Sequence, residues 1–188
     1  MARRKTISDE AVLDAAAKVM FAVGPAFTLA DVARAAGIAP ATLVQRFGDK
    51  HGLTVAAIAR DNAAFETFLA AMPDGVGAEA VIAVFAAMFD GLDTDADRFA
   101  DQLLWLRQDM RDPHLNRLAR ERFAALRAAV AARMPPLPIA SDEAAHLVEA
   151  QWQGLLVQWG IEREGRLSDF VAAQLRAWFT LLDGRPPR

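Results

Sequence analysis

The side chains best suited to binding chemistry lie in the first third of the chain. Thr42, Gln45 and Arg46 are polar groups on one short segment. A glutamine amide has the geometry to pair with adenine in the major groove, and an arginine contacts either a phosphate or a guanine edge. The small side chains of Ala39 and Ala41 fit against thymine methyl groups.

Residues that flank this segment are expected to contact phosphates, which fix the position of a protein on DNA without specifying sequence. Thr28, at a predicted helix start, offers its hydroxyl and the nearby backbone amides to a phosphate. Lys50 offers a positive charge to the same backbone. Arg3, Arg4 and Lys5 are expected to form an arm that adds salt-dependent affinity.

The elements that must hold these side chains form a predicted helix-turn-helix. Thr28 and Asp31 are spaced for a capping box that opens the first helix. Gly37 supplies the positive φ of a tight turn, and Leu43 and Phe47 anchor the second helix. A helical hairpin inside an ordinary core would use the same glycine and apolar pair. The polar outer face of the second helix favours DNA binding.

Residues 7–57 resemble the DNA-binding domain of the TetR-type transcriptional regulators. The resemblance implies that Thr28 and Lys50 contact the DNA backbone. Val44, also expected at the DNA surface, lies where the family usually has a tyrosine whose hydroxyl reaches a phosphate, and this chain has no tyrosine. The matching pieces are the helix at 11–23 with Gly24, then Phe27-Thr28, Asp31-Val32-Ala33, Ala36-Gly37-Ile38, Thr42-Leu43, Phe47 and Lys50.

An all-α fold of about nine helices is predicted, because alanine and leucine dominate and strand signals are lacking. The same number and order of helices is what the resemblance implies. Residues 1–50 are expected to form the helix-turn-helix DNA-binding domain, and residues 51–188 a helical domain for effector binding and dimerisation. Besides the two helices of the helix-turn-helix, the expected helices span 9–23, 50–71, 78–92, 95–110, 113–133, 142–165 and 169–182.

Charge is distributed unevenly along the chain. Residues 1–60 carry eight Lys and Arg against five Asp and Glu, a net +3, and the rest carries thirteen against nineteen, a net −6. These values sum to the overall −3. A basic amino-terminal third suits a DNA-binding domain, although so small an excess also arises by chance.

The composition, at 54% hydrophobic and 24% charged residues, is that of a globular protein. The chain has no cysteine, which excludes disulfides and fits a reducing compartment. Its longest apolar run, 80–89, is too short to span a bilayer, and no secretory signal is visible. We therefore expect a cytoplasmic protein without a membrane partner.

A homodimer is expected, because one short recognition helix gives limited affinity and such proteins bind two half-sites. The two predicted carboxy-terminal helices carry more apolar surface than one face needs, and part of one, 154–159, resembles the eighth helix of many TetR-type proteins. A purely intramolecular core is the alternative. The predicted interface residues are Val148, Leu155, Trp159, Leu175, Trp178 and Phe179.

A small-molecule effector is what the resemblance implies for the carboxy-terminal domain, where ligand binding changes the separation of the two DNA-binding heads. Bulky apolar residues with a few polar ones would favour an apolar or aromatic ligand. Each of these residues has an alternative role as ordinary core. The candidate pocket residues are Phe85, Met88, Phe89, Gln102, Trp105, Leu106, Met110, Phe123 and Trp152.

An enzyme is not expected, since hydrolase and phosphate-loop patterns are missing. His51, His114 and His146 are scattered without metal-ligand spacing, so neither a metal site nor a cofactor is predicted. The sequence thus predicts a TetR-like repressor that a small effector releases from a palindromic operator in double-stranded DNA. The alternatives are an activator and a helical protein-interaction module with a weakened DNA-binding head.

Overall fold

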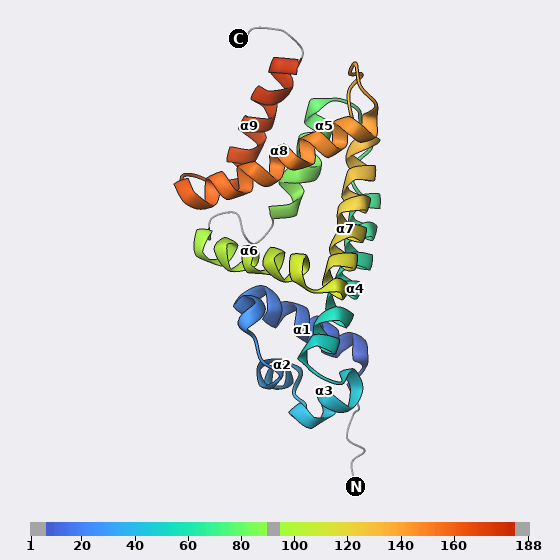
Figure 1. Cartoon of the computed structure of the whole chain (residues 1–188), viewed down its shortest axis with the longest axis vertical. Coiled ribbons are helices and arrows are strands. Elements are labelled where there is room, and N and C mark those ends of the chain that lie inside the picture. Colours follow the sequence, from blue (N-terminus) through green and yellow to red (C-terminus); the bar gives the residue numbers. More distant parts are fainter. Residues whose placement is uncertain (1–6, 90–94, 183–188) are drawn as a thin grey trace. The chain divides into compact units, whose positions relative to one another are not determined.

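Every regular element in the computed structural model, which describes residues 7–89 and 95–182, is a helix (Figure 1). The predicted all-α class with nine α-helices is confirmed within these ranges. The α-helices are α1 Asp9–Val23, α2 Leu29–Ala36, α3 Pro40–Phe47, α4 Lys50–Ala70, α5 Ala78–Ala86, α6 Ala96–Arg111, α7 Pro113–Ala131, α8 Ser141–Glu162 and α9 Leu167–Leu182. Short 3₁₀ turns follow α1 at Gly24–Ala26 and α5 at Ala87–Phe89. The predicted arm at residues 3–5 lies outside the described residues.

Local sequence signals account for several helix ends. Ser8 caps α1 by accepting a hydrogen bond from the Ala11 amide, and Asp49 accepts one from the Gly52 amide at the start of α4. Ser141 is the first helical residue of α8, and the N-cap is Ala140, which offers no side-chain acceptor. Arg163 ends α8 in the left-handed conformation, with φ 57°.

The chain forms two compact units, and each has its own core. Unit 1 comprises Met1–Phe65 and Asp101–Glu121, and unit 2 comprises Glu66–Ala100 and Arg122–Arg188. These boundaries fall inside α4, α6 and α7, whereas the predicted division of roles placed the boundary after residue 50. The packing of the helices does not test which residues bind DNA and which bind an effector, so the division of these roles after residue 50 stays a prediction.

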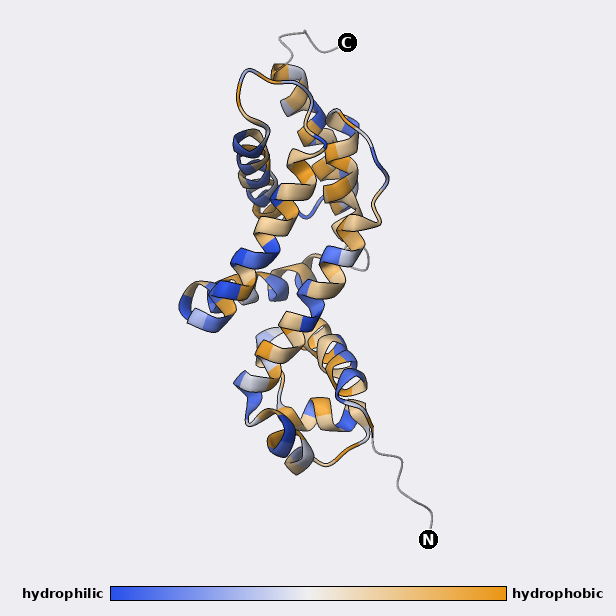
Figure 2. Cartoon of the chain, turned by 90° about the vertical axis from the view of Figure 1, so that its right-hand side faces the viewer, coloured by the Kyte–Doolittle hydropathy of each residue, from blue (hydrophilic) through white to orange (hydrophobic). Residues whose placement is uncertain are grey.

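The core of unit 1 is built on α1. Val12, Ala16 and Met20 follow one another at steps of four, so they lie on one face of the helix, and all three are buried. Bands of hydrophobic and hydrophilic residues follow one another along the helices (Figure 2). The residues that complete this core are Phe27, Val32, Ala33, Leu43, Leu53 and Ala57.

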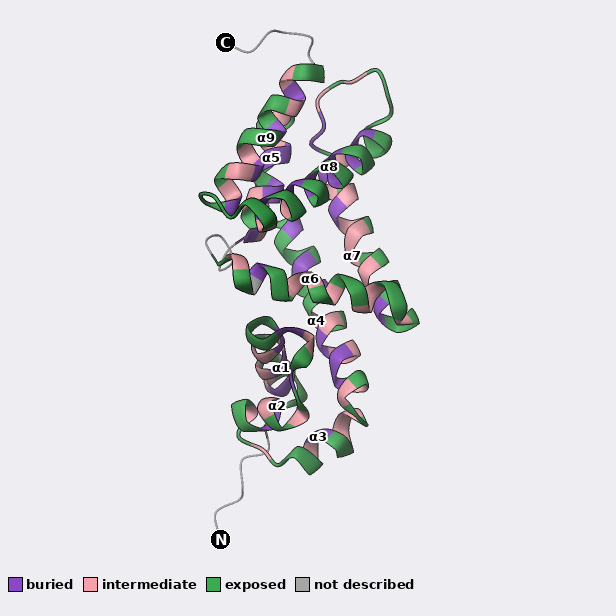
Figure 3. Cartoon of the chain, turned by 60° about the vertical axis from the view of Figure 1, so that its left-hand side comes forward, coloured by how far each residue is buried: buried purple, intermediate pink, exposed green. Residues whose placement is uncertain are grey.

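In unit 2, α9 packs against both α5 and α8. Leu175 and Val171 of α9 are fully buried, as are Val81, Val84 and Phe85 of α5. Figure 3 shows bands of buried residues on both helices. Ion pairs join elements of this unit. The Arg176 guanidinium holds Glu79 through two hydrogen bonds of 2.6 and 2.8 Å, and Arg127 contacts the buried Glu149 at 2.9 Å. Each of the other exposed ion pairs in the unit contributes little to the stability of the fold.

Arg133, just after α7, holds the connection between α4 and α5. Its guanidinium is buried and donates to the carbonyl oxygens of Met72 and Pro73, each at 3.2 Å. Its own carbonyl oxygen accepts the Gly77 amide at 2.9 Å. Among the described residues, no helix is long and apolar enough to cross a membrane.

Candidate nucleic-acid interface

The start of α2 has the capping box that the sequence predicts. The Thr28 hydroxyl accepts the Asp31 amide at 3.2 Å, and the Thr28 amide donates to the Asp31 carboxylate at 2.9 Å. The Thr28 hydroxyl also donates to this carboxylate, at 2.7 Å. The bonds that the Thr28 hydroxyl and then the Thr28 amide donate to the Asp31 carboxylate, with a smaller contribution from Arg34, hold the pKa of Asp31 below its usual range. The Thr28 hydroxyl is therefore already engaged.

A tight turn joins α2 to α3. Gly37 ends α2 in the left-handed conformation, with φ 68° and ψ 32°, as predicted. The next helix starts at Pro40, whose fixed φ suits the first helical position and which has no N–H to satisfy. Leu43 is fully buried in the core of unit 1 and Phe47 packs against that core, so the opposite face of α3 is turned outward.

The outward face of α3 carries most of the predicted base-contacting residues. Val44 and Gln45 lie three and four residues after Ala41, so they share a face with it, and all three are exposed. Val44 has 48% of its surface exposed, which is high for an apolar side chain of this size. Ala39, in the turn, is exposed too, whereas Thr42 is half-buried.

Arg46 does not belong to this exposed set. Its guanidinium donates to the Ile7 carbonyl oxygen at 2.9 Å and to the Asp9 carboxylate at 3.1 Å, so it ties α3 to the start of α1. Only 20% of its side chain is exposed. The sequence offers no local signal for this contact, because the partners lie 37 and 39 positions away.

Lys50 likewise has partners inside unit 1. Its Nζ donates to the Pro25 carbonyl oxygen at 2.7 Å and lies 4.5 Å from the centre of the Phe27 ring, a distance typical of a cation–π contact. The first residue of α4 thus holds the connection between α1 and α2. A phosphate contact by Lys50 would exchange these bonds for new ones.

A comparison with known families identifies this arrangement. Residues 12–60 match the family model of bacterial regulatory proteins, tetR family, and include all of α2 and α3. The chain has a TetR-family amino-terminal domain. The predicted resemblance is thereby confirmed, and the helix-turn-helix is the DNA-binding element of that domain. No curated protein matches the chain in sequence.

Solved structures share the fold over most of the chain. GusR of Salmonella enterica has 20% identity and a TM-score of 0.66, over 95% of this chain and 98% of that one. A Bacillus subtilis regulator, FadR in complex with stearoyl-CoA, has 14% identity and a TM-score of 0.64, over 95% and 100%. A TetR regulator from Rhodococcus sp. RHA1 has 19% identity and a TM-score of 0.57, over 92% and 93%. At such identities the likeness shows a shared fold.

The predicted effector residues are divided between the two units. Gln102, Trp105, Leu106 and Met110 belong to the α6 segment of unit 1. There Gln102 donates to the Phe21 carbonyl oxygen at 2.8 Å, and the Trp105 ring is 6.3 Å from that of Phe27. These two contacts give Gln102 and Trp105 structural roles in unit 1. The predicted residues that belong to unit 2 are Phe85, Met88, Phe89, Phe123 and Trp152.

Three of the unit 2 residues form an aromatic cluster. The Trp152 ring stacks on Phe85 with centroids 5.1 Å apart and lies 6.3 Å from Phe89, and all three are buried. The Trp152 Nε1 atom is buried and has no hydrogen-bond partner within the described ranges. A buried donor without an acceptor is costly, so this N–H is the one polar feature of the cluster that needs an explanation.

The predicted dimer residues lie mainly in the interior of unit 2. Val148, Leu155 and Trp159 of α8 are buried, as are Leu175 and Phe179 of α9. Trp178 is half-buried and contacts the Phe179 ring edge-on, with centroids 5.0 Å apart. In the single chain, five of the six side chains are thus part of the core of unit 2, as the alternative of an intramolecular core expects.

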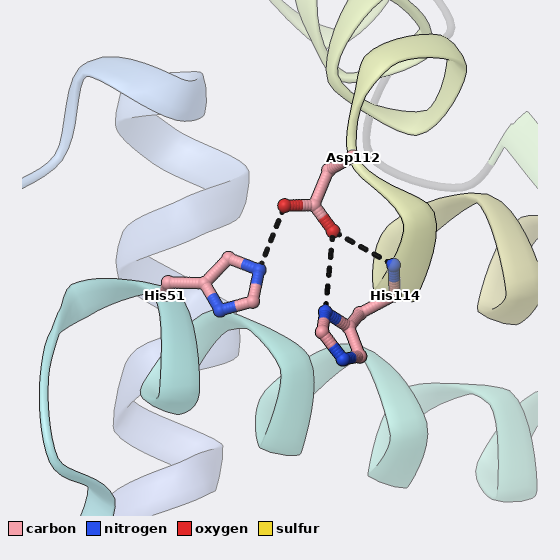
Figure 4. A group of neighbouring side chains, drawn as sticks. All are labelled: His51, Asp112 and His114. Carbon is pink, nitrogen blue, oxygen red and sulfur yellow. Dashed lines mark hydrogen bonds and ion pairs between the residues drawn. The ribbon is translucent and has the colours of Figure 1, made fainter.

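A group that sequence reasoning missed lies in unit 1. His51 at the start of α4 and His114 in the first turn of α7 both contact Asp112 (Figure 4). The sequence gives no spacing signal for this group, because folding brings together His51 and Asp112, which lie 61 positions apart. His146 lies exposed on α8.

Proposed function

We propose that the chain is a DNA-binding transcriptional repressor that acts as a homodimer on a palindromic operator and is released by a small apolar or aromatic effector. The exposed face of α3, within a TetR-family helix-turn-helix, is the observation that carries this proposal. Gln45 lies at its centre with small or aliphatic neighbours, which leaves room for the edges of bases.

Phosphate contacts in this proposal come first from the start of α2. The first-turn amides of a helix lack intrahelical acceptors and point toward the solvent, where they bind anions. Thr28 positions that turn through the capping box, and Lys50 and Arg46 hold α4 and α3 against α1 and its flanks. Lys50 then serves in two ways, as a brace in unit 1 and as a positive charge near the DNA backbone.

The homodimer is proposed to use the outer face of α8 rather than its buried face. Leu147, Gly154, Val157 and Ile161 follow one another at steps of seven, three and four, so they share a face. The three apolar side chains are 49%, 47% and 77% exposed, and no atom lies within 4 Å of where a Cβ on Gly154 would be. This stripe offers a partner helix apolar contacts and a close approach.

The effector is proposed to bind beside the aromatic cluster of Phe85, Phe89 and Trp152. The buried N–H of Trp152 would find its acceptor in an oxygen or nitrogen atom of the ligand, whose apolar part would meet the rings. FadR, which has the same fold, holds stearoyl-CoA, a ligand with a long apolar chain. That likeness supports a ligand role for the fold without identifying the compound.

The test begins with selection of binding sites from random DNA by the purified protein, at near-physiological salt with excess competitor DNA. Enrichment of a palindromic sequence, protected in footprinting, is the expected result. The selected site then serves as the probe for an effector screen, in which an active compound releases the DNA and quenches tryptophan emission.

Failure of the selection to enrich any sequence would contradict the repressor proposal and favour the helical interaction module. Transcription from a promoter that carries the selected site distinguishes repressor from activator. The expected outcome is lower transcription with the protein and recovery when the effector is added.

A further inference from the structure

We propose that His51, Asp112 and His114 form a binding site for a divalent transition-metal ion, with Zn²⁺ the first candidate. The three side chains converge from two parts of unit 1, the first turn of α4 and the junction of α6 with α7 (Figure 4). Each offers one ligand atom, and these atoms all lie within 4.8 Å of one another. The site does not depend on the proposed function in transcription.

The distances fit a metal ion after small side-chain movements. His51 Nε2 is 2.8 Å from Asp112 Oδ2, and His114 Nδ1 is 3.9 Å from Asp112 Oδ1. With Zn–N and Zn–O bonds of about 2.0–2.2 Å, the ligands of a tetrahedral ion lie roughly 3.3–3.5 Å apart. The His51 separation is shorter than this range and the His114 separation, to the other carboxylate oxygen, is longer, so both exposed rings would rotate to share one ion.

Backbone contacts already orient the carboxylate. Asp112 Oδ1 accepts the amides of His114 and Leu115 at 2.9 and 3.0 Å, which leaves Oδ2 directed at His51. Outer hydrogen bonds of this kind commonly fix the geometry of ligating carboxylates.

The donor set selects the class of ion. Two imidazoles and one carboxylate suit Zn²⁺, Co²⁺, Ni²⁺ and Cu²⁺, whereas Mg²⁺ and Ca²⁺ prefer oxygen ligands alone. The side chains of His51 and His114 are 44% and 66% exposed, so solvent reaches the site and supplies the remaining ligands. An ion held there would connect the first turn of α4 to the start of α7.

A simpler role for the group is helix capping, with Asp112 as the cap of α7 and His51 as its ion-pair partner. Capping needs only Asp112 and the amides, and His114 has no part in it through its ring. The approach of the second imidazole is what distinguishes a three-ligand site from a cap, and the two rings meet edge-on with centroids 5.4 Å apart.

The experiment is titration of the chelator-treated full chain with ZnCl₂ by calorimetry, and with Co²⁺ followed by visible absorption. We expect one ion per chain and a Co²⁺ spectrum of a nitrogen- and oxygen-ligated ion. His51→Gln and His114→Gln should each weaken Zn²⁺ binding by roughly tenfold or more, since loss of even an outer-shell partner costs about 10–100-fold. His146→Gln, which alters the third histidine, is the matched control and should bind like the unaltered chain.

Thermal unfolding separates a site from non-specific binding. Zn²⁺ should raise the melting temperature of the unaltered chain and of His146→Gln, but not that of His51→Gln or His114→Gln. Asp112→Asn keeps a side chain that caps α7, so its metal-free melting temperature should stay close to that of the unaltered chain while Zn²⁺ binding weakens. Equal Zn²⁺ affinity of the unaltered chain and a His51→Gln, His114→Gln double variant would overturn the proposal, as would equal weakening by His146→Gln.

Discussion

Gln45 and Lys50 differ in what surrounds them, and that difference predicts different effects on DNA binding. Gln45 is exposed on α3, while Lys50 is half-buried and bonded to the Pro25 carbonyl oxygen. Gln45→Ala should relax the preference at one base pair of the selected site, by about 1–3 kcal/mol of discrimination. Lys50→Ala should weaken binding to all sequences. It should also reduce the slope of log affinity against log salt concentration by about one.

Competition binding to single-base variants of the selected site, repeated at several salt concentrations, measures both effects. Because Lys50 also braces unit 1, its variant is compared after a thermal-unfolding check of the fraction folded. Indistinguishable profiles for the two variants would contradict their assigned roles.

Side chains whose roles are local could be predicted from the sequence, and those with distant partners could not. The capping box of Thr28 and Asp31 and the left-handed Gly37 depend on neighbours within a few positions. Arg46 was expected to contact DNA from the polar face of α3, and Lys50 because the TetR resemblance implies a contact with the DNA backbone. Their carbonyl partners, Ile7 and Pro25, are 39 and 25 positions away, and only the folded chain brings them close.

At the scale of elements, the junction of α3 and α4 depends on a glycine that the sequence analysis did not use. A Cβ at Gly52 would overlap the backbone oxygen of Phe47, the last residue of α3. Backbone atoms at the end of a helix have little freedom to move aside. Gly52 therefore sets how closely α4 can follow the recognition helix.

Gly52→Ala should lower the free energy of unfolding by about 1–3 kcal/mol, the range expected for overpacking. Ala59→Gly, at an exposed position of the same helix, is a control for helix propensity and should cost about 1 kcal/mol. Urea unfolding followed by circular dichroism measures both. A Gly52→Ala variant as stable as the unaltered chain would show that the junction is able to relax.

The ion pair of Glu79 with Arg176, which joins α5 to α9, predicts a pH effect on stability. The hydrogen bonds from Arg176 lower the pKa of Glu79 below its ordinary value of 4.5, so the folded state favours the carboxylate. Its contribution is then complete above about pH 5 and is lost as pH falls through the folded-state pKa. Both side chains are more than half exposed, so solvent screens the pair.

Glu79→Gln should therefore be less stable than the unaltered chain at pH 7, by less than about 1 kcal/mol. The difference should shrink below about pH 4.5 and disappear once Glu79 is protonated in both states. Urea unfolding at pH 7 and near pH 3 tests this. A difference that grows on acidification would contradict the sign of the shift.

The two faces of α8 explain why the dimer residues were harder to predict than the helix itself. Val148, Trp152 and Leu155 form one apolar stripe, and Leu147 and Val157 belong to another. Both stripes have helical spacing, so the pattern predicts the helix but not which stripe is buried inside the unit. The described structure buries the first and exposes the second.

At the scale of the whole molecule, Ile161→Glu should weaken the proposed dimer by about tenfold or more, because it places a charge in an apolar contact (about 1.4 kcal/mol per tenfold). Ser141→Glu, an acid in the first turn of the same helix, is the control and should leave the dimer intact. Sedimentation velocity at several concentrations measures the association. An unchanged dimer in Ile161→Glu would place the interface on another surface.

The position of Trp105 has a consequence for optical spectroscopy. The chain has four tryptophans and no tyrosine, so its near-ultraviolet emission comes from indole rings alone. Trp105 is the one tryptophan of unit 1, and the other three belong to unit 2. The Trp105 ring packs against Phe27, the residue that precedes Thr28, the N-cap of α2. The emission of a Trp105→Phe variant therefore reports unit 2 alone, and its difference from the unaltered chain reports the side of unit 1 that adjoins α2. Unlabelled protein can thus show separately how each unit responds to DNA, to an effector or to a metal ion.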